Sequence, residues 1–192
     1  MGVRQVVSEW NQYRYYEVSP GKFSLSECNR IIDLHQSSDS TLSQLYDHTG
    51  SKLRDSNLFW IRKAPDTAWI FERVEAAVAQ YNKSYGFELI EQVDTAQLTR
   101  YSDNQQYGWH VDLGPNQASL RKVSVVVELT PRATRVGGGV EIFYGETSNN
   151  KVPLQAGDLL IFPSFVLHRA SKVESGVRWS LVFWFMGQTP FR

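Results

Sequence analysis

The hydrophobic pattern of the chain changes its period near Leu89, and this change limits the folds that are open to it. Before that position, apolar residues recur at helical spacing in two segments. After it, apolar residues fall in short, β-branched segments with a period of two, bounded by turn residues. Helices followed by a run of short strands favour an α+β fold in which antiparallel strands form a barrel or a double-sheet jelly roll.

The first half of the chain carries clear helix signals. Residues 24–27, Ser-Leu-Ser-Glu, offer a capping box for a first helix. Asp66 is expected to cap a second helix, which Gly86 ends. The segment between them, from Ser37 to Asp55, is polar and is expected to be irregular. Strands are expected at Tyr13–Val18 and Leu58–Ile61.

The second half is expected to contain about seven strands. We place them at Leu89–Tyr101, Trp109–Asp112, Val123–Leu129, Val140–Tyr144, Leu159–Phe162, Leu167–Val173 and Val177–Met186. Three glycines, Gly137 to Gly139, precede a strand rather than a helix, which favours a bulge or a tight turn over a phosphate-binding loop.

Composition indicates one globular domain without a strong electrostatic partner. The 192 residues carry 20 basic and 20 acidic side chains, so no net field attracts the chain to nucleic acid or to a membrane surface. No apolar run approaches the length of about 20 residues that crosses a bilayer. The N-terminus lacks the apolar core of a signal peptide, and the single cysteine, Cys28, fits a reducing compartment. These features predict a cytoplasmic protein.

His110 and Asp112 form the first candidate for chemistry. They occupy alternate positions of an expected strand, so their side chains point to the same side of the sheet and can reach a common metal ion. Taken alone, such a pair more often consists of surface polar residues than of metal ligands.

His168 ends an apolar segment and is expected to be buried or to line a pocket, where it needs a hydrogen-bond partner or a metal. A structural core histidine is the alternative. Two imidazoles and one carboxylate on one face of a metal ion leave other coordination positions open, as in non-haem iron oxygenases.

Arg178 lies within an apolar strand that has no acidic residue at alternate positions. A ligand carboxylate would satisfy its guanidinium, and Ser180 has the same parity and could help to hold that carboxylate. The alternative is an ion pair with an acidic residue distant in sequence. If residues 174–176 form a hairpin turn, His168 and Arg178 lie on adjacent strands.

With these residues, the chain resembles the Fe(II)- and 2-oxoglutarate-dependent dioxygenases, specifically the prolyl 4-hydroxylase-like group and its compact bacterial and phage relatives. The resemblance runs from about Phe23 to Gly187. Asn104 stands where these relatives usually have glycine, and asparagine tolerates a left-handed backbone better than most residues. The segments that carry the resemblance are 26–28, 101–112, 121–124, 137–141, the strand of His168, and 176–180.

The resemblance implies a double-stranded β-helix, or jelly roll, with N-terminal helices packed on the major sheet. It implies one catalytic domain over residues 1–192, with a helical part at about 1–88 and the jelly-roll core at about 89–187. It further implies that three residues bind Fe(II), namely His110, Asp112 and His168. Arg178 would bind 2-oxoglutarate, with Tyr101 and Ser180 as hydrogen-bonding partners.

The implied activity is oxidative: 2-oxoglutarate is decarboxylated to succinate and CO2 while O2 hydroxylates a substrate, with ascorbate as an optional reductant. A prolyl residue in a peptide or protein is the favoured substrate. The alternatives are a free amino acid, another small molecule or a nucleobase, and nucleic acid is disfavoured by the neutral charge. A non-catalytic jelly-roll module that binds a metal is the lesser alternative. The sequence leaves the oligomeric state open.

Several further residues are candidates for contact with the substrate or for walls of the site. Tyr107, Trp109 and Arg54 are the first candidates for substrate contact, followed by Trp60, Arg121 and Lys122. Apolar walls are expected from Phe162, Leu181 and Trp184. The segments Leu45–Arg54 and Thr130–Val136 are candidates for a lid.

Overall fold

Antiparallel pairing connects most strands of the protein into one curled sheet. The computed structural model describes residues 16–38, 41–46, 49–90, 93–143 and 151–191. Its strands are β1 (Glu17–Ser19), β2 (Thr41–Tyr46), β3 (Lys52–Arg62), β4 (Thr95–Tyr101), β5 (Gln106–His110), β6 (Arg121–Glu128), β7 (Val136–Gly137), β8 (Val140–Ile142), β9 (Leu159–Pro163), β10 (His168–Ala170), β11 (Val173–Ser175) and β12 (Arg178–Met186). The main sheet has the order β1-β9-β6-β12-β4-β3-β5-β10-β8, with β2 paired to β3, and β7 pairs with β11 in a separate ribbon.

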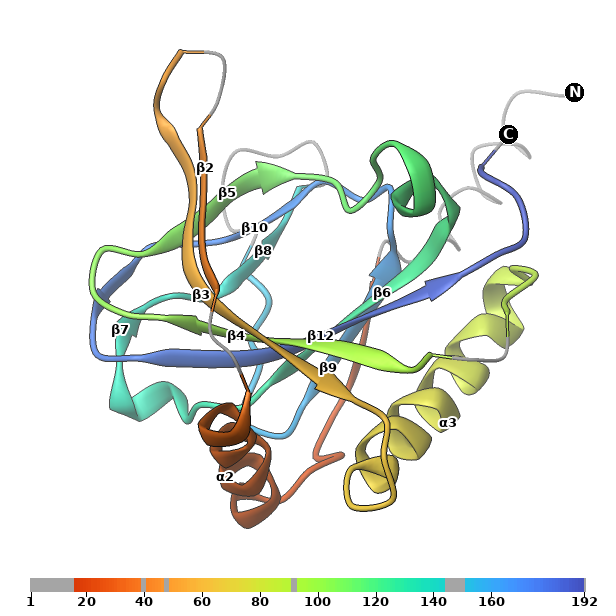
Figure 1. Cartoon of the computed structure of the whole chain (residues 1–192), viewed down its shortest axis with the longest axis horizontal. Coiled ribbons are helices and arrows are strands. Elements are labelled where there is room, and N and C mark those ends of the chain that lie inside the picture. Colours follow the sequence, from red (N-terminus) through yellow and green to blue (C-terminus); the bar gives the residue numbers. More distant parts are fainter. Residues whose placement is uncertain (1–15, 39–40, 47–48, 91–92, 144–150, 192) are drawn as a thin grey trace, which may run out of the picture.

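Two helices cover one face of this sheet. The helices are α2 (Leu25–Asp33) and α3 (Ala68–Tyr85), and they lie on the same side of the strands, while the β2–β3 hairpin extends in the opposite direction (Figure 1). Short 3-10 helices follow α2, precede β6 and precede β7, at Leu34–Ser37, Asn116–Leu120 and Arg132–Thr134.

Side-chain alternation along the strands separates two apolar clusters. On β12, Leu181 and Phe183 are fully buried in the larger cluster, together with Ile31 of α2 and Phe71 of α3. The intervening residues of β12 point to the other face, where a smaller cluster forms around Phe162 between the two layers of the curled sheet. The sheet therefore carries one apolar cluster on each of its two faces.

The helix boundaries follow the predicted signals at two of the three predicted ends. Ser24 caps α2 through the expected capping box with Glu27. Gly86 ends α3 with a positive φ of 67°, as predicted. The prediction for the start of α3 was wrong, because Thr67 rather than Asp66 precedes the helix and makes no side-chain cap. Its hydroxyl instead accepts a hydrogen bond from the Ala64 amide.

The segment predicted to be irregular, Ser37 to Asp55, contains most of a β-hairpin instead. Strand β2 pairs with β3 from Thr41 to Tyr46, and β3 begins at Lys52. The hairpin was missed because β2 is almost entirely exposed, so its side chains carry no apolar alternation. The early strand was predicted from Tyr13; residues 13–15 lie outside the described part, and β1 begins at Glu17.

The backbone supports the remaining turn assignments. Asn104 adopts a φ of 67°, the left-handed conformation that glycine favours. Gly137 and Gly138 also have positive φ, and a Cβ at Gly137 would lie 2.3 Å from the Lys172 carbonyl oxygen. This close approach explains the glycine run as a tight turn.

The division of the chain into a helical part and a jelly-roll core near residue 88 stays a proposal. The main sheet contains strands from both sides of that position. Strand β3 precedes that position and pairs with both β4 and β5. Within the described ranges, no helix is long and apolar enough to cross a membrane.

Gly157 offers a test of how tightly the turn before β9 is packed. Its φ is +92°, and a Cβ there would lie 1.8 Å from the carbonyl oxygen of Phe23. We expect Gly157→Ala to lower the free energy of unfolding by about 2–5 kcal/mol, because backbone strain and overlap add. Gly50→Ala is the control: φ is +81° there, nothing lies within 4 Å, and only the conformational cost of about 1–2 kcal/mol applies. Urea unfolding of both variants measures the difference, and equal losses would contradict it.

Candidate active site

Strand pairing brings the two candidate histidines together. His110 at the end of β5 is the direct register partner of His168 at the start of β10. Directly opposed residues of an antiparallel pair have their Cβ atoms about 4.5–5.5 Å apart. The two imidazole ring centroids are 4.2 Å apart, so both rings face one small volume.

Asp112 completes this group two residues beyond His110. Its Oδ1 lies 3.6 Å from Nε2 of His110, and its Oδ2 lies 3.7 Å from Nε2 of His168. All three ligand atoms fall within 4.8 Å of one another. Two imidazole nitrogens and one carboxylate could hold a divalent metal ion and leave other coordination positions open.

Both rings are oriented by the backbone. Nδ1 of His110 lies 2.8 Å from the Gly108 carbonyl oxygen, and Nδ1 of His168 lies 2.9 Å from that of Val166. A proton on Nδ1 satisfies each carbonyl and leaves the lone pair of Nε2 free for a metal. Burial lowers the pKa of His168, which favours the neutral form that a metal requires.

The Asp112 carboxylate is held in the ionised form. Burial alone would raise its pKa. The neighbouring His168 and His110 and a hydrogen bond from Ser124 lower the pKa by more than burial raises it, so it lies well below its usual range. The Ser124 hydroxyl lies 2.6 Å from Oδ2 and fixes the orientation of the carboxylate. This donor set fits a metal that prefers mixed nitrogen and oxygen ligands.

A cavity of about 400 Å³ opens beside these three residues. Its lining includes all three, and from the opposite layer of the sheet it includes Arg178 and Ser180 of β12 and Tyr101 of β4. The register explains their proximity, because Arg178 pairs with Tyr101 and Ser180 follows two positions later on the same face.

The predicted hairpin between His168 and Arg178 was wrong. Strand β10 pairs with β5 and β8, whereas β12 pairs with β4 and β6. Residues 173–175 form β11, which pairs with β7 rather than turning directly into β12. His168 and Arg178 therefore reach the same cavity from two layers and not from neighbouring strands.

Arg178 has a protein partner that is distant in sequence. Its Nε donates to Oε2 of Glu128 at 3.0 Å, and both side chains are 2% exposed. Its Nη2 is buried and has no hydrogen-bond partner in the described part of the chain. The guanidinium therefore keeps donors available for a ligand although its charge is paired. Burial raises the pKa of Tyr101, whose ring centroid lies 5.7 Å from the guanidinium carbon, so the phenol keeps its proton and can donate.

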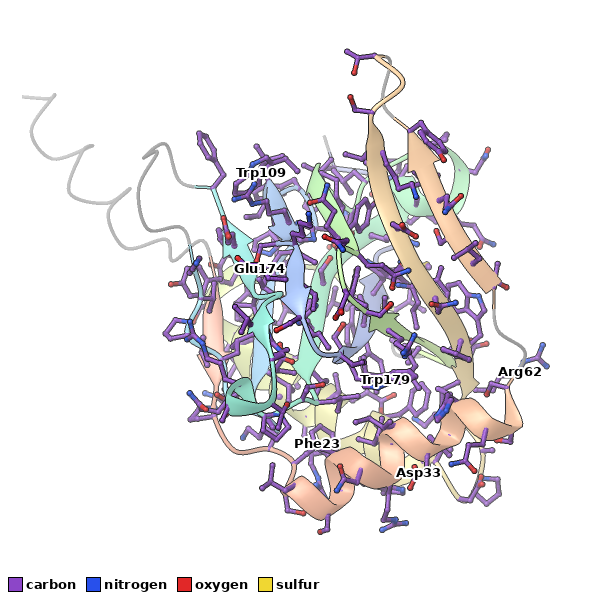
Figure 2. All side chains as sticks on the ribbon, turned by 90° about the vertical axis from the view of Figure 1, so that its left-hand side faces the viewer. Phe23, Asp33, Arg62, Trp109, Glu174 and Trp179 are labelled. Atoms are coloured by element: carbon purple, nitrogen blue, oxygen red, sulfur yellow. The ribbon has the colours of Figure 1, made fainter. Side chains whose placement is uncertain are left out.

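The candidates for substrate contact divide into two groups. Tyr107 and Arg54 line the cavity, as do Trp60 and Arg121. Trp109 and Lys122 do not, and the Trp109 indole instead contacts the Arg169 guanidinium carbon at 4.7 Å. Figure 2 shows Trp109 at the end of the sheet that is remote from Arg62.

The expected apolar walls and lids are only partly found. Trp184 lines the cavity, and Phe162 packs its ring 4.6 Å from that of His168. Leu181 was wrongly placed, because it points into the helix-covered core. Of the two lid candidates, the first contributes Leu45 and Tyr46 to β2 and Lys52 to Arg54 to β3, while Thr130–Val136 borders a separate cavity.

Two residues with structural roles at the site were not assigned from the sequence. Ser124 orients Asp112, and Glu128 binds Arg178. They stand four residues apart on β6, where the residues between them are all valines, so they share a face. Polar residues repeated on one face of a buried strand were the available signal.

Comparison with protein families agrees with this geometry. Residues 96–186 match the model of the 2OG-Fe(II) oxygenase superfamily. A PKHD-type hydroxylase from Xylella fastidiosa (strain M23) is 39% identical over 99 residues, which cover 45% of this chain and 42% of that relative. The chain thus spans less than half the length of the curated relatives it matches.

Solved structures match nearly the whole chain. A prolyl hydroxylase from Trichoplax adhaerens, in complex with a hypoxia inducible factor oxygen degradation domain peptide fragment, has a TM-score of 0.73 at 19% identity and covers 96% of this chain and 89% of its own. The viral collagen prolyl hydroxylase from Paramecium Bursaria Chlorella virus-1, in a 2OG complex, has a TM-score of 0.66 at 19% identity, with coverage of 91% and 97%. These matches confirm the predicted double-stranded β-helix with helices on the major sheet.

Ser124 should tune metal binding without contacting the metal. We expect Ser124→Ala to weaken the binding of a divalent metal by about tenfold or more, because Asp112 loses the hydrogen bond that orients it. Ser164→Ala is a matched control, since the Ser164 hydroxyl contacts Ser124 at 3.0 Å but not the carboxylate. Competition with a fluorescent chelator for Zn(II) or Mn(II) measures both affinities. Equal affinities in the two variants would show that Ser124 has no orienting role.

Proposed function

We propose that the chain is a member of the 2OG-Fe(II) oxygenase superfamily, whose model matches residues 96–186, and that it is an Fe(II)- and 2-oxoglutarate-dependent hydroxylase that acts on prolyl residues in a peptide or protein. One observation carries the proposal: the three candidate metal ligands and the buried Arg178 line the same cavity. A metal site alone would also suit a binding module. A cationic, donor-rich residue in the opposite wall adds a place for a dicarboxylate.

The metal ligands in this proposal are His110, Asp112 and His168. Their hydrogen bonds to Gly108, Val166 and Ser124 fix ring tautomers and carboxylate orientation before a metal arrives. Such preorganisation reduces the cost of binding.

Arg178 would bind the distal carboxylate of 2-oxoglutarate. Glu128 holds Nε, so the guanidinium is fixed and Nη2 remains free to donate. Tyr101 and Ser180 supply neutral hydroxyl donors beside it. Because the site is buried, each of these charge-assisted hydrogen bonds is stronger than it would be in water.

When bound, Fe(II) and 2-oxoglutarate would supply the oxidising chemistry, in which O2, cosubstrate and a C–H bond yield succinate, CO2 and a C–OH bond. The protein contributes position and exclusion of water. Val126, Val140 and Val182 give the cavity apolar lining, and Phe162 packs against the ring of His168.

The prolyl substrate is supported by the names of the structural neighbours, several of which are prolyl hydroxylases and one of which carries a peptide. Ascorbate as a reductant and a cytoplasmic location stay predictions from the resemblance and the composition.

Anaerobic titration tests the metal and cosubstrate sites. We expect Fe(II) followed by 2-oxoglutarate to produce the visible charge-transfer band of a chelated 2-oxoacid, because the cavity offers open positions beside the metal ligands. His168→Ala should abolish the band. Arg178→Gln should require at least about tenfold more 2-oxoglutarate, since a charge-assisted hydrogen bond worth about 1.5–3 kcal/mol is lost.

Arg62→Gln is the control, because Arg62 is exposed at the far end of β3 (Figure 2). A folded wild-type protein that binds iron but shows no band would overturn the assignment at cosubstrate binding.

The substrate class is tested by uncoupled and coupled turnover. With O2 present, we expect proline-containing peptides to raise succinate release at least about tenfold over the rate without substrate, because a bound substrate completes the closed site. Free proline, single-stranded oligonucleotides and peptides with proline replaced by alanine are compared under the same conditions. If free proline or an oligonucleotide raised succinate release more than the peptides did, that compound class would be the better substrate and the prolyl-peptide proposal would be wrong. If the alanine peptides raised succinate release as much as the proline peptides, proline would be excluded as the target.

A further inference from the structure

The cavity lining has more positive charges than its own carboxylates balance. Four arginines line it, and two have carboxylate partners: Arg178 binds Glu128, and Arg169 binds Glu141 with Nη2 and Oε2 2.7 Å apart. Arg54 and Arg121 also line it, and within the described ranges neither forms an ion pair.

Arg121 sits in a corner that is rich in unused donors. Its Nη1 donates to the backbone oxygen of Asp112 at 3.1 Å, and its guanidinium carbon lies 3.9 Å from the ring centroid of Trp184. Nε of Arg121 and Nε1 of Trp184 are both buried without an acceptor in the part of the chain that the structure describes. Buried donors of this kind normally have partners, so two together in one cavity wall indicate a ligand that brings acceptors.

Arg54 supplies the second unpaired cation. It is 9% exposed, its Nε donates to the Ser56 hydroxyl at 3.1 Å, and its guanidinium carbon lies 4.6 Å from the ring centroid of Tyr107. Arg54 lines the cavity beside Tyr107, and Arg121 lines it beside Asp112, to whose backbone oxygen it donates. The Tyr107 ring is itself stacked on His110 at 3.5 Å, so this part of the cavity adjoins the metal ligands.

The cosubstrate does not account for these two cations. In the proposed function, one carboxylate of 2-oxoglutarate belongs to Arg178 and the other to the metal. The four arginines and a divalent metal ion would carry six positive charges, while Asp112, Glu128, Glu141 and the two carboxylates of 2-oxoglutarate would carry five negative charges. The occupied site would therefore keep one positive charge in excess. A buried cation without a counter-charge is costly, and a substrate with one acidic group would remove that cost.

We therefore propose that the substrate carries a carboxylate next to the position that is oxidised, and that Arg121, Trp184 and Arg54 bind it. This inference rests on the proposed function and narrows its substrate class. The carboxylate can belong to an aspartate or glutamate adjacent to the target residue in a peptide, or it can be the α-carboxylate of a C-terminal residue.

The experiment compares acids with their isosteric amides. The full chain is loaded with Fe(II) and 2-oxoglutarate without oxygen, and binding is measured by isothermal titration calorimetry. One pair is N-acetyl-L-proline and N-acetyl-L-prolinamide, and the other is the capped peptides Ala-Pro-Glu-Ala and Ala-Pro-Gln-Ala. We expect the acid of at least one pair to bind about tenfold or more tightly than its amide. The pair that shows the larger ratio identifies the source of the carboxylate.

The variants test where the carboxylate binds. Arg121→Gln and Arg54→Gln should each bring the ratio of acid to amide affinity close to one, and Trp184→Phe, which keeps the ring and removes the N–H donor, should lower it severalfold. Arg62→Gln should leave it unchanged. An acid that binds no better than its amide, no binding by any of the four compounds, or a ratio that survives both arginine variants would overturn the inference. The charge-transfer band tests the metal and cosubstrate sites independently of the substrate. A failure of the proposed function can therefore be told apart from a failure of this inference.

Discussion

Side-chain alternation on β6 and β12 is the constraint on which the rest of the structure depends. Successive residues of a strand point to opposite faces, so one sheet can support an apolar core and a polar cavity at the same time. On β12, Leu181 and Phe183 anchor α2 and α3, while Arg178, Ser180 and Val182 face the cavity. A shift of the register by one residue would place the arginine among the helices. The hydrophobic core therefore fixes the direction in which the charged residues point.

The buried pair of Arg178 and Glu128 illustrates what this placement requires. Burying two charges costs free energy, and a buried ion pair by itself is weak evidence of added stability. Glu128 also lies 3.3 Å from Nη2 of Arg135, so one carboxylate neutralises part of two guanidinium groups. The pairing leaves Nη2 of Arg178 without an acceptor. That orphaned donor is understandable if the pair serves to position the arginine for a ligand rather than to stabilise the fold.

Local sequence signals predicted what depends on local structure. The capping box at Ser24, the glycine that ends α3 and the β-branched segments from β4 onward follow from short-range rules and are found in the structure. Long-range pairing was less accessible. The expected hairpin between His168 and Arg178 was wrong because β10 and β12 lie in different layers and pair with strands distant in sequence. Strand β2 was missed because an exposed strand has no apolar pattern. The ion pair between Glu128 and Arg178 could likewise not be predicted, because the two residues are 50 positions apart in the sequence.

The two layers of the curled sheet divide the chemistry between them. The three candidate metal ligands come from β5, from the residues that follow it and from β10, where direct cross-strand pairing sets their separation. The buried donors without acceptors that line the cavity come from the ends of β6 and β12 in the other layer. Metal ligands must converge on one point, which a single register can supply. In the proposed function, the anionic groups of cosubstrate and substrate would instead be held apart, because Arg178 and Arg121 lie on different strands of the opposite wall. The metal ligands therefore depend on the register of one strand pair, whereas the arginines depend on their positions on two different strands.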